Sequence, residues 1–395
     1  MKGVHGNIMK EFSTSIKDII ARLDFWVIIT SVAMTFLSIL MLYGGMDAFP
    51  GGKTKFMVQC VAALLGIIIM LVIATLDYDA ICTKFEMFFF AMSIGMLILV
   101  IVVNLGSSNS TNHNWIKIPG IPFNIQPGEF VKISYIITFS RHVDRVKADI
   151  NKIKNVAFLA LHAGVIIGLV LITGDLGTTL VYMFLTAIIL YTAGLSLWYF
   201  AAAGVILLIA APFLWDKMAD YQRLRIMAGF DPTIDPDVYG YQAIMSKNAI
   251  ISGGFKGAGL FGGTQYLKVP AAHSDFLFCV LAEKLGFFGT FTYLFLMCVL
   301  VIRLLIISRR TRKGYASLIC VGIAAVMIAQ TIENIGMCLA MLPVVGITLP
   351  FFSYGGSSML TMFISLGVVQ SICTHNRKYY FEREPFSASI QSPRL

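Results

Sequence analysis

The sequence predicts an all-α protein that crosses a membrane many times. Of its 395 residues, 57% are hydrophobic and only 13% carry a charge, whereas soluble domains average about 25% charged residues. The hydrophobic residues come in blocks of roughly 20, the length of helix that spans a bilayer. A membrane β-barrel would instead show segments of about 10 residues with alternating polarity. We therefore expect a polytopic helical membrane protein.

Ten blocks qualify as transmembrane spans when the chain is followed from its N-terminus, with boundaries defined to within a few residues. The fourth is the most polar, because it is short and contains Glu129 and Lys132. An even number of spans puts both ends of the chain on the same side of the membrane. The predicted spans are residues 25–46, 55–76, 85–105, 126–141, 155–173, 176–193, 197–215, 275–302, 316–341 and 350–373.

The distribution of Lys and Arg predicts on which side of the membrane the two ends of the chain lie. Segments on the side of the two termini hold about twice as many of these residues as the opposite segments. Because cytoplasmic segments carry this excess in membrane proteins, we expect both termini in the cytoplasm, with a short cytoplasmic tail at residues 382–395. The formal net charge of +9 lies mostly in these short connections, so it does not indicate a nucleic-acid partner.

One connection, residues 216–274 between the seventh and eighth spans, is much longer than the others. The count of spans places it outside the cell, and connections of this length are usually functional or disordered. Residues 241–251 have the apolar spacing of a helix, and the glycines that follow are typical of turns. We expect a structured extracellular loop with one or two short helices. The chain as a whole, residues 1–395, is predicted to form one membrane domain.

Unusual polar residues gather at the outer ends of the predicted spans. Trp115 and Glu129 flank the third and fourth spans, and Asp175 lies at the turn between the fifth and sixth. Asp275 ends the long loop, and a hydroxyl-rich patch, Ser353-Tyr354-Gly355-Gly356-Ser357-Ser358, opens the tenth span. Loosely helical backbone at membrane depth is tolerated only beside protein or a water-filled cavity. We therefore predict a polar cavity that opens towards the outer face.

Two interpretations apply to Asp275, and they are compatible. A carboxylate just before an apolar run commonly caps the first N–H groups of a helix and suits the helix dipole. The same carboxylate at the edge of a cavity can take a proton from a substrate hydroxyl. For Asp175, which lies in a tight turn, we expect a structural role as the cap of the sixth span.

Glu129, Lys132, Glu283 and Glu333 are four ionisable residues within the predicted spans, where such groups are costly and usually face a bundle interior or form pairs. Glu129 and Lys132 are three positions apart on one helix, so we expect them to pair with each other. Glu283 and its neighbour Lys284 point in directions about 100° apart on a helix, so they need different partners. Glu333 is the fourth of these residues.

Five cations of the long loop are candidates for binding an anion: Arg223, Arg225, Lys247, Lys256 and Lys268. Each alone is an ordinary solvated charge, but together they can hold a phosphate or pyrophosphate group, which Arg binds with a bidentate fork. The chain has no P-loop, Rossmann fingerprint or HExxH motif. Its substrate must therefore carry its own activation and reach the outer face, as a sugar linked to a lipid through pyrophosphate does.

Five stretches of the sequence closely resemble the SEDS family of shape, elongation, division and sporulation proteins. The resemblance runs in consistent order from about Trp115 to Gln370. The chain departs from the family's usual pattern at Asn114, where an arginine is usual, and at Lys284, where a glutamate is common. The five stretches are residues 115–130, Gly174-Asp175-Leu176-Gly177-Thr178, residues 272–286 with His273-Ser274-Asp275-Phe276, residues 330–337 and residues 342–358.

This resemblance implies a ten-span fold and a function. Members of the family are understood as peptidoglycan glycosyltransferases that use lipid II and work with a class B penicillin-binding protein. The aspartate of the family's His-Ser/Thr-Asp-Phe motif is its essential catalytic residue, and here that residue is Asp275. The resemblance also implies that Asp175 and the hydroxyl-rich patch line the cavity. We expect Trp115 and His273 to contact the substrate as well.

The reaction implied by the resemblance is inverting glycosyl transfer at the outer leaflet of a bacterial plasma membrane. The growing glycan on undecaprenyl pyrophosphate is the donor, lipid II is the acceptor, and Asp275 is the general base. We expect the loop cations to stabilise the leaving pyrophosphate. A divalent cation, Mg²⁺ or Mn²⁺, is a candidate helper, and the sequence indicates no other cofactor. It leaves open whether the protein serves elongation, division or sporulation.

Two other classes of function remain open at this point. A transporter that flips lipid-linked precursors would need ionisable groups near the membrane midplane, broken helices and inverted repeats. Glu283 and Glu333 fit the first requirement, but the sequence shows no convincing repeat. A non-catalytic scaffold of a cell-wall synthase is the third possibility, although a scaffold has little need of Asp275 beside a cavity.

Overall fold

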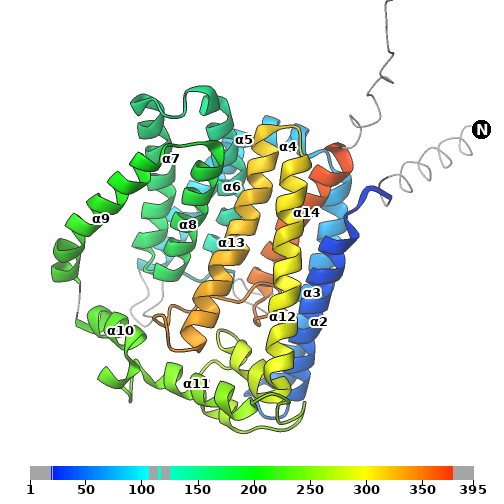
Figure 1. The fold of residues 1–395 in the computed structure, drawn as a ribbon. Helices are drawn as coiled ribbons and strands as arrows, with labels where there is room; N and C mark the ends of the chain where they lie inside the picture. The colour runs from blue at the N-terminus through cyan, green and yellow to red at the C-terminus, as the bar shows by residue number, and fades with distance from the viewer. Residues whose placement is uncertain (1–18, 20, 106–113, 117–124, 219, 377–395) are drawn as a thin grey trace, which may run out of the picture.

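The protein folds into a bundle of α-helices (Figure 1). The structure is a computed structural model, and it describes residues 19, 21–105, 114–116, 125–218 and 220–376. The predicted all-α class is confirmed. The predicted cytoplasmic tail, residues 382–395, lies outside the described residues. The α-helices are α2 Phe25–Gly44, α3 Gly52–Thr75, α4 Tyr78–Lys84, α5 Glu86–Leu105, α6 Pro127–Val146, α7 Ile153–Ile172, α8 Leu176–Ala193, α9 Leu197–Lys217, α10 Asp220–Phe230, α11 Tyr241–Gly253, α12 Leu277–Arg310, α13 Gly314–Cys338 and α14 Gly356–Asn376. Short 3₁₀ turns are η1 Lys147–Asp149, η2 Pro232–Ile234 and η3 Gln265–Lys268.

Each of the ten predicted spans corresponds to one long helix. Nine of these helices, among the described residues, are long and apolar enough to cross a membrane. The tenth, α6, contains five charged residues, which is why its sequence gives the weakest signal. It is nevertheless buried along most of its length, because it packs between α5 and α13. The chain is a multi-pass membrane protein.

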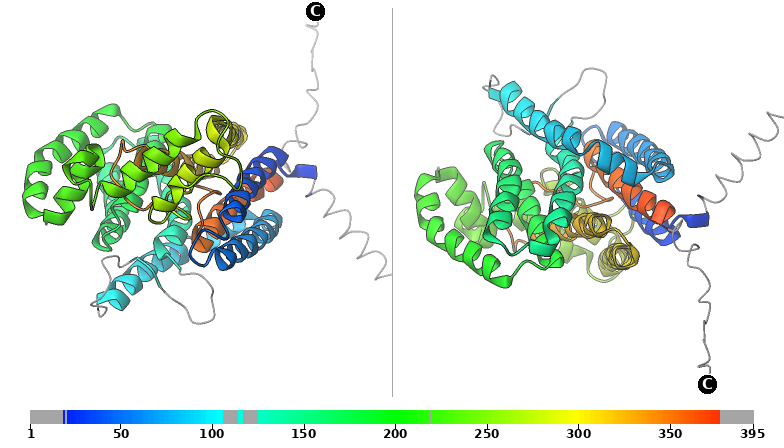
Figure 2. Two further views of the ribbon diagram at one scale, coloured as in Figure 1. Left: turned by 90° about the horizontal axis from the view of Figure 1, so that it is seen from below. Right: turned by 90° about the horizontal axis from the view of Figure 1, so that it is seen from above.

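The connections divide the bundle into two distinct ends. Helices α10 and α11 lie together at one end, at the bottom of Figure 1, which we call the loop end. Helix α4 lies at the opposite end, where the described chain also begins and finishes. Seen from the loop end, α10 and α11 run across the base of the bundle (Figure 2). Both helices belong to the long connection, so the prediction of one or two short helices there is confirmed.

Helices α13 and α14 form the centre of the fold and are the most buried of the apolar helices. Helix α14 packs along α3, and α13 packs against α6, α8 and α12. Helix α9 is the exception, because none of the described residues in its apolar window is buried. It stands at the edge of the bundle in Figures 1 and 2.

Glu283 and Lys284 anchor the long connection to the first turns of α12. The Glu283 carboxylate accepts hydrogen bonds from the backbone N–H groups of residues 264, 265 and 266 at 2.6–2.8 Å. The Lys284 ammonium donates to the carbonyls of Gly44, Leu260 and Gly262. The expectation of separate partners is confirmed. Glu283 is thus a structural anchor at the loop end, which corrects its assignment to the membrane interior.

Two helices depart from the predicted spans for local reasons. Helix α12 is interrupted at Gly286, whose φ of +62° is non-helical. The backbone of Phe255 and Gly257 lies so close to Gly286 that a Cβ there would meet it at 2.5 Å, so the loop requires a glycine. Helix α14 begins only at Gly356, so Ser353, Tyr354 and Gly355 belong to the connection before it and not to the tenth span.

Candidate functional site

Asp275 lies in a turn directly before α12 and is held from the side of α13. Its backbone carbonyl accepts a 2.7 Å hydrogen bond from Asn334 Nδ2, which also lies 2.6 Å from the carbonyl oxygen of Ile347. The carboxylate faces Gly346, where a Cβ would lie 3.5 Å from Asp275 Oδ2. Because Gly346 has a φ of +72°, the backbone approaches the carboxylate in a conformation that side-chain-bearing residues rarely adopt.

The Asp275 side chain is partly buried and accepts no hydrogen bond in the described part of the chain. The residue that caps α12 is Phe276, and no side chain bonds the first N–H groups of this helix, so the capping interpretation of Asp275 is wrong. Burial, together with the nearby negative charge of Asp175, raises the pKa of Asp275 from 3.8 to about 6. A carboxylate with a pKa near neutrality is well suited to act as a general base.

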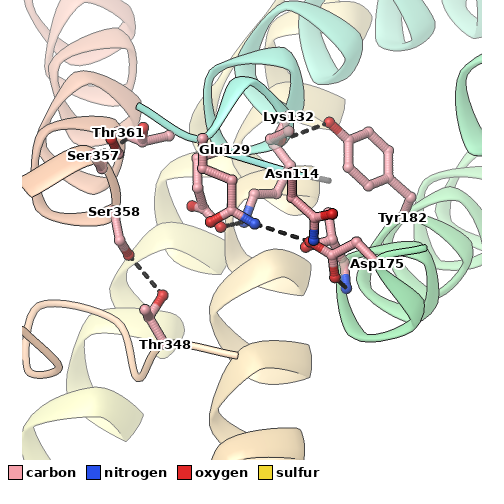
Figure 3. A network of polar contacts seen from close by, with 12 residues as sticks. Asn114, Glu129, Lys132, Asp175, Tyr182, Thr348, Ser357, Ser358 and Thr361 are labelled. Carbon is pink, nitrogen blue, oxygen red and sulfur yellow. Dashed lines mark hydrogen bonds and ion pairs between the residues drawn. The ribbon is translucent and has the colours of Figure 1, made fainter. Parts of the chain in front are cut away.

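Asp175 caps α8 and ties three segments together. Its Oδ1 accepts a 2.9 Å hydrogen bond from the backbone N–H of Thr178, which confirms the predicted cap. Its Oδ2 accepts from Asn114 Nδ2 and from Gln126 Nε2, both at 2.9 Å (Figure 3). The carboxylate therefore holds two points of the connection between α5 and α6, Asn114 and the residue directly before α6. These residues also line a small cavity at this point.

Glu129 and Lys132 form the predicted ion pair, with Lys132 Nζ 2.6 Å from Glu129 Oε1 (Figure 3). Both side chains are at least 97% buried. The second carboxylate oxygen of Glu129 and the Thr178 hydroxyl are buried without a hydrogen-bond partner among the described residues. One oxygen of Glu333 is in the same situation. Since buried polar atoms normally have partners, these atoms are available to water or to a polar ligand.

The hydroxyl-rich patch forms an ordered turn. Ser353 Oγ accepts a hydrogen bond from the backbone N–H of Leu349 at 2.8 Å, and the Ser358 hydroxyl lies 2.8 Å from that of Thr348. Gln59 of α3 bonds the patch twice, to the carbonyl of Ser353 at 3.2 Å and to the N–H of Gly355 at 3.3 Å. Ser357 lies in the first turn of α14 and is buried. The patch is thus fixed in place beside the Asp275 turn.

His273 connects the Asp275 turn to this patch. Its ring centroid lies 5.8 Å from that of Tyr354 and 5.9 Å from that of Phe49. Burial and the nearby charge of Lys55 lower the pKa of His273 to about 4. The imidazole is therefore neutral at pH 7 and can both donate and accept a hydrogen bond.

The structure does not join the five loop cations in one anion site. Arg223 bonds the carbonyls of Trp215 and Asp216 at the end of α9, and Arg225 bonds the carbonyl of Val344. Their guanidinium groups are thus engaged by backbone. The other three, Lys247, Lys256 and Lys268, are exposed on separate segments of the connection. Trp115 is 40% exposed.

Several residues that shape this site have no role predicted from the sequence. Asn334 and Gln59 are fully buried amides in otherwise apolar helices. Polar side chains within membrane spans usually have a specific partner, so an Asn or Gln in an apolar helix indicates a structural contact. Gly346 left no such signal, because its role depends on a positive φ and on which side chain approaches it.

Known proteins similar to this chain share one family. The family model for FtsW, RodA and SpoVE, described as "Cell cycle protein", matches residues 20–378. The "Probable peptidoglycan glycosyltransferase FtsW" of Trichlorobacter lovleyi is 31% identical over 361 residues, which covers 89% of this chain and 93% of that protein. The peptidoglycan glycosyltransferase MrdB of Escherichia coli K12 is 35% identical over 286 residues, 71% of this chain and 76% of MrdB.

Solved structures also match this chain. A chain of a peptidoglycan synthase complex, described as coordinating polymerization and crosslinking, matches with a TM-score of 0.77 at 26% identity, covering 89% of this chain and 97% of that chain. The rod shape determining protein RodA of Thermus thermophilus matches with a TM-score of 0.66 at 24% identity, covering 90% and 97%, which shows the shared fold. The chain therefore belongs to the FtsW, RodA and SpoVE family, the SEDS proteins.

Proposed function

We propose that this chain is a peptidoglycan glycosyltransferase that polymerises lipid II, with Asp275 as its general base. The observation that carries the assignment is the state of the Asp275 carboxylate. It is partly buried beside Gly346, it accepts no hydrogen bond from the described residues, and its pKa is about 6. A base in this state is ionised at neutral pH and free to accept a proton.

In the proposed step, Asp275 takes the proton from the 4-hydroxyl of the acceptor sugar as that oxygen attacks C1 of the donor sugar. The new bond joins the acceptor oxygen to C1, and the bond from C1 to the pyrophosphate oxygen breaks. The pyrophosphate leaves with that electron pair, and attack from the opposite face inverts C1. A positioned general base contributes about 10²–10⁴-fold to such a rate.

The proposed orientation puts the loop end outside the cell and both termini in the cytoplasm of the bacterium. Its support is the excess of Lys and Arg at the end of the bundle where the described chain begins and finishes. Asp275 then faces the outer leaflet, where the lipid-linked sugars are polymerised. The proposed partner is a class B penicillin-binding protein, supported by the matching chain of a peptidoglycan synthase complex.

A divalent cation finds no ready site in the described part of the chain. No group of three or more His, Cys, Asp or Glu side chains among these residues is arranged to hold a metal ion. Asp175 accepts three hydrogen bonds, and one oxygen of Glu129 is paired with Lys132. The proposed step therefore uses the side chains alone.

The experiment that tests the proposal is lipid II polymerisation by the purified full-length protein, with and without its class B partner. The wild-type protein should produce glycan ladders, and Asp275→Asn should reduce them at least 100-fold with an unchanged thermal transition. Equal polymerisation by the Asn variant would remove Asp275 as the base.

A lipid flippase is the second candidate, favoured by one observation. The buried pair Glu129–Lys132 and the buried oxygen of Glu333 place ionisable groups within the helices, as transporters require. Absence of ladders with the partner present and lipid II intact, together with transport of lipid II in vesicles, would support this function over polymerisation.

A further inference from the structure

Two histidines face each other between α6 and α7. His142 lies near the end of α6 and His162 in the middle of α7, and their Nδ1 atoms are 3.1 Å apart. The rings are stacked, with centroids 5.3 Å apart and an angle of 26° between their planes. A hydrogen bond between two imidazoles needs one Nδ1 that carries a proton and one that does not. The bond therefore breaks when both imidazoles are protonated.

Aromatic rings hold His162 in this position. Its ring meets those of Phe90, Phe139 and Tyr135 edge to face, with centroids 4.8, 5.4 and 5.9 Å away, an arrangement that aromatic rings prefer. Tyr135 is itself fixed, because its hydroxyl lies 2.7 Å from a threonine hydroxyl of α8. The imidazole of His162 thus has little freedom to turn away from its partner.

The charged groups around the pair come from α5 and from the end of α6. Arg141 and Arg145 both bond the carboxylate of Glu86, which begins α5, and the Arg141 Nε lies 2.8 Å from it. Helix α7 has no charged residue except Lys154 in its first turn, and α8 has none. Asp144 of α6 faces the first residue of α13. The carboxylate next to the pair is therefore Glu86, and two guanidinium groups share it.

A second proton on the pair would meet repulsion. Arg145 and Glu86 are the charged side chains that act on His142, and His142 is the one that acts on His162. Because Glu86 is already shared by two arginines, it cannot compensate a further positive charge. A nearby like charge disfavours the charged form of a group. Two imidazolium groups at this distance would therefore separate.

The pair is also the polar link between α6 and α7. In the part of the chain that the structure describes, two side-chain hydrogen bonds join these helices, and both use His162. One is the bond to His142, and the other joins His162 Nε2 to the Thr138 hydroxyl at 3.5 Å. Only 22% of the residues in the most apolar stretch of α7 are buried within the protein, so few other contacts hold this helix. Loss of the bond between the histidines should therefore loosen α7.

Helix α7 leads directly to the candidate active site. It ends at Ile172, and Asp175 follows three residues later as the cap of α8. From His162 to the end of α7 there is about 15 Å of continuous helix, which transmits a displacement along its length. The negative charge of Asp175 contributes to the raised pKa of Asp275. A shift of α7 at His162 therefore reaches the surroundings of the proposed base.

We propose that the His142–His162 pair is a proton-sensitive link that slows the reaction at Asp275 when the cytoplasm becomes acidic. Proton uptake by both imidazoles breaks their bond, separates α7 from α6 and displaces the turn that carries Asp175. Glu86 directly follows α4 in the chain, so the pair lies towards the end of the bundle that is opposite the loop end (Figure 1). The inference rests on the proposed function for the reaction and on the proposed orientation for the source of the protons.

The test is polymerisation by the full-length protein in sealed vesicles whose internal and external pH are set separately. The class B partner is incorporated with it, and lipid II is added from outside, so that only molecules with an outward loop end react. The external pH stays at 7.5, where the proposed base is ionised, while the internal pH is varied from 7.5 to 5.5. This design separates the histidine pair from Asp275, which responds to the external pH.

The wild-type rate should fall about three- to ten-fold over this range of internal pH, because an imidazole with an ordinary pKa of about 6.5 is mostly protonated at pH 5.5. His142→Asn should keep the wild-type rate at every internal pH, since its amide fills the place of Nδ1 and takes up no proton. His162→Phe keeps the ring packing but loses the bond, so its rate should be low at every internal pH. The matched control is His375→Gln, which changes a histidine in the last turn of α14, at the same end of the bundle, and it should respond as the wild type does.

A second measurement follows the pair itself. In ¹⁵N NMR of histidine-labelled protein in the same vesicles, the pair should show one protonated and one unprotonated Nδ1 at internal pH 7.5 and two protonated ones at pH 5.5. The His142→Asn and His162→Phe variants assign these signals, and their thermal transitions show that they are folded. A wild-type rate that is independent of internal pH, or a response that persists in His142→Asn, would overturn the inference.

The two proposals fail separately in these experiments. A pair that gains its second proton and loses its bond, in a protein that makes no glycan strands, would support the proton-sensitive contact and contradict the glycosyltransferase. Normal strand synthesis that ignores the internal pH would support the glycosyltransferase and reject the link.

Discussion

The side chain of Asn334 donates a 2.7 Å hydrogen bond to the backbone carbonyl of Asp275. Because the same amide nitrogen lies 2.6 Å from the carbonyl of Ile347, Asn334 fixes the turn that carries the proposed base against the segment that faces it. Gly346, which faces the Asp275 carboxylate, is the neighbour of Ile347. A side chain of α13 thus holds the turn that carries the proposed base, although Asp275 itself precedes α12.

Replacing Asn334 with Ala should therefore impair catalysis more than folding. The variant leaves the buried carbonyl of Ile347 without a donor and the carbonyl of Asp275 with only the Cys338 thiol at 4.0 Å, and an unsatisfied buried group costs about 1–3 kcal/mol. We expect polymerisation to fall more than ten-fold in a protein that still unfolds cooperatively. The measurement is turnover and thermal unfolding on the same preparation, and full activity would exclude a positioning role for Asn334.

The pH dependence of polymerisation should report the ionisation of Asp275. Its pKa of about 6 means that the base is protonated below this pH and ionised above it. The initial rate should rise with pH through about 6 and then level off. A rate that does not change between pH 5 and 7 would contradict this role.

The stability of the protein should fall as pH rises, whereas the rate of polymerisation should rise. The pKa of Asp275 is raised from 3.8 in the unfolded chain to about 6 in the folded protein, so the folded state binds this proton more tightly. Between these two values stability falls as pH rises, and at pH 7 the buried charge is a cost. Asp275→Asn should therefore melt at or above the wild-type temperature at pH 7 and show no advantage at pH 4. A lower melting temperature at pH 7 would contradict this account.

Asp175→Asn should shift the same pH profile. The negative charge of Asp175 contributes to the raised pKa of Asp275, so its removal should move the acid limb of the profile to lower pH. The variant should also lose stability, because an amide NH₂ at Oδ2 would face the Asn114 and Gln126 donors. The pH profile distinguishes the two effects, since loss of stability alone would lower the rate without moving its midpoint.

Removing one member of the buried Glu129–Lys132 ion pair should destabilise the protein more than removing both charges together. Lys132→Met leaves the Glu129 carboxylate buried without its partner, which costs about 3–5 kcal/mol. The double variant Glu129→Gln, Lys132→Met removes both charges and should recover most of that loss. Thermal unfolding of the two single variants and the double variant gives the coupling. Additive losses would mean that the charges do not stabilise each other.

Much of the architecture could be predicted because the bilayer imposes simple rules on sequence. Apolar blocks near 20 residues long located the long helices. The apolar spacing of residues 241–251 located α11 of the long connection. The pairing of Glu129 with Lys132 and the α8 cap at Asp175 also followed from local spacing, since both contacts lie within one turn of helix.

Predictions failed where the contact partner lies far away in the chain. Local spacing suggested that Asp275 caps α12, but the turn is set by Asn334, 59 residues later. Glu283 looked like a membrane carboxylate, yet it bonds the N–H groups of residues 264–266. The loop cations looked like an anion site, yet Arg225 bonds Val344, 119 residues away.

The sequence by itself determined the helical class, the spans and the residues with chemical potential, because hydrophobic length and helical spacing are local properties. Only the tertiary structure decided which of those residues act together. It left the Asp275 carboxylate beside Gly346 and without a hydrogen-bond donor among the described residues, and it placed His273 between the hydroxyl-rich patch and an aromatic cavity. The physical reason is that burial and desolvation, which set the pKa of Asp275, depend on helices brought together from distant parts of the chain.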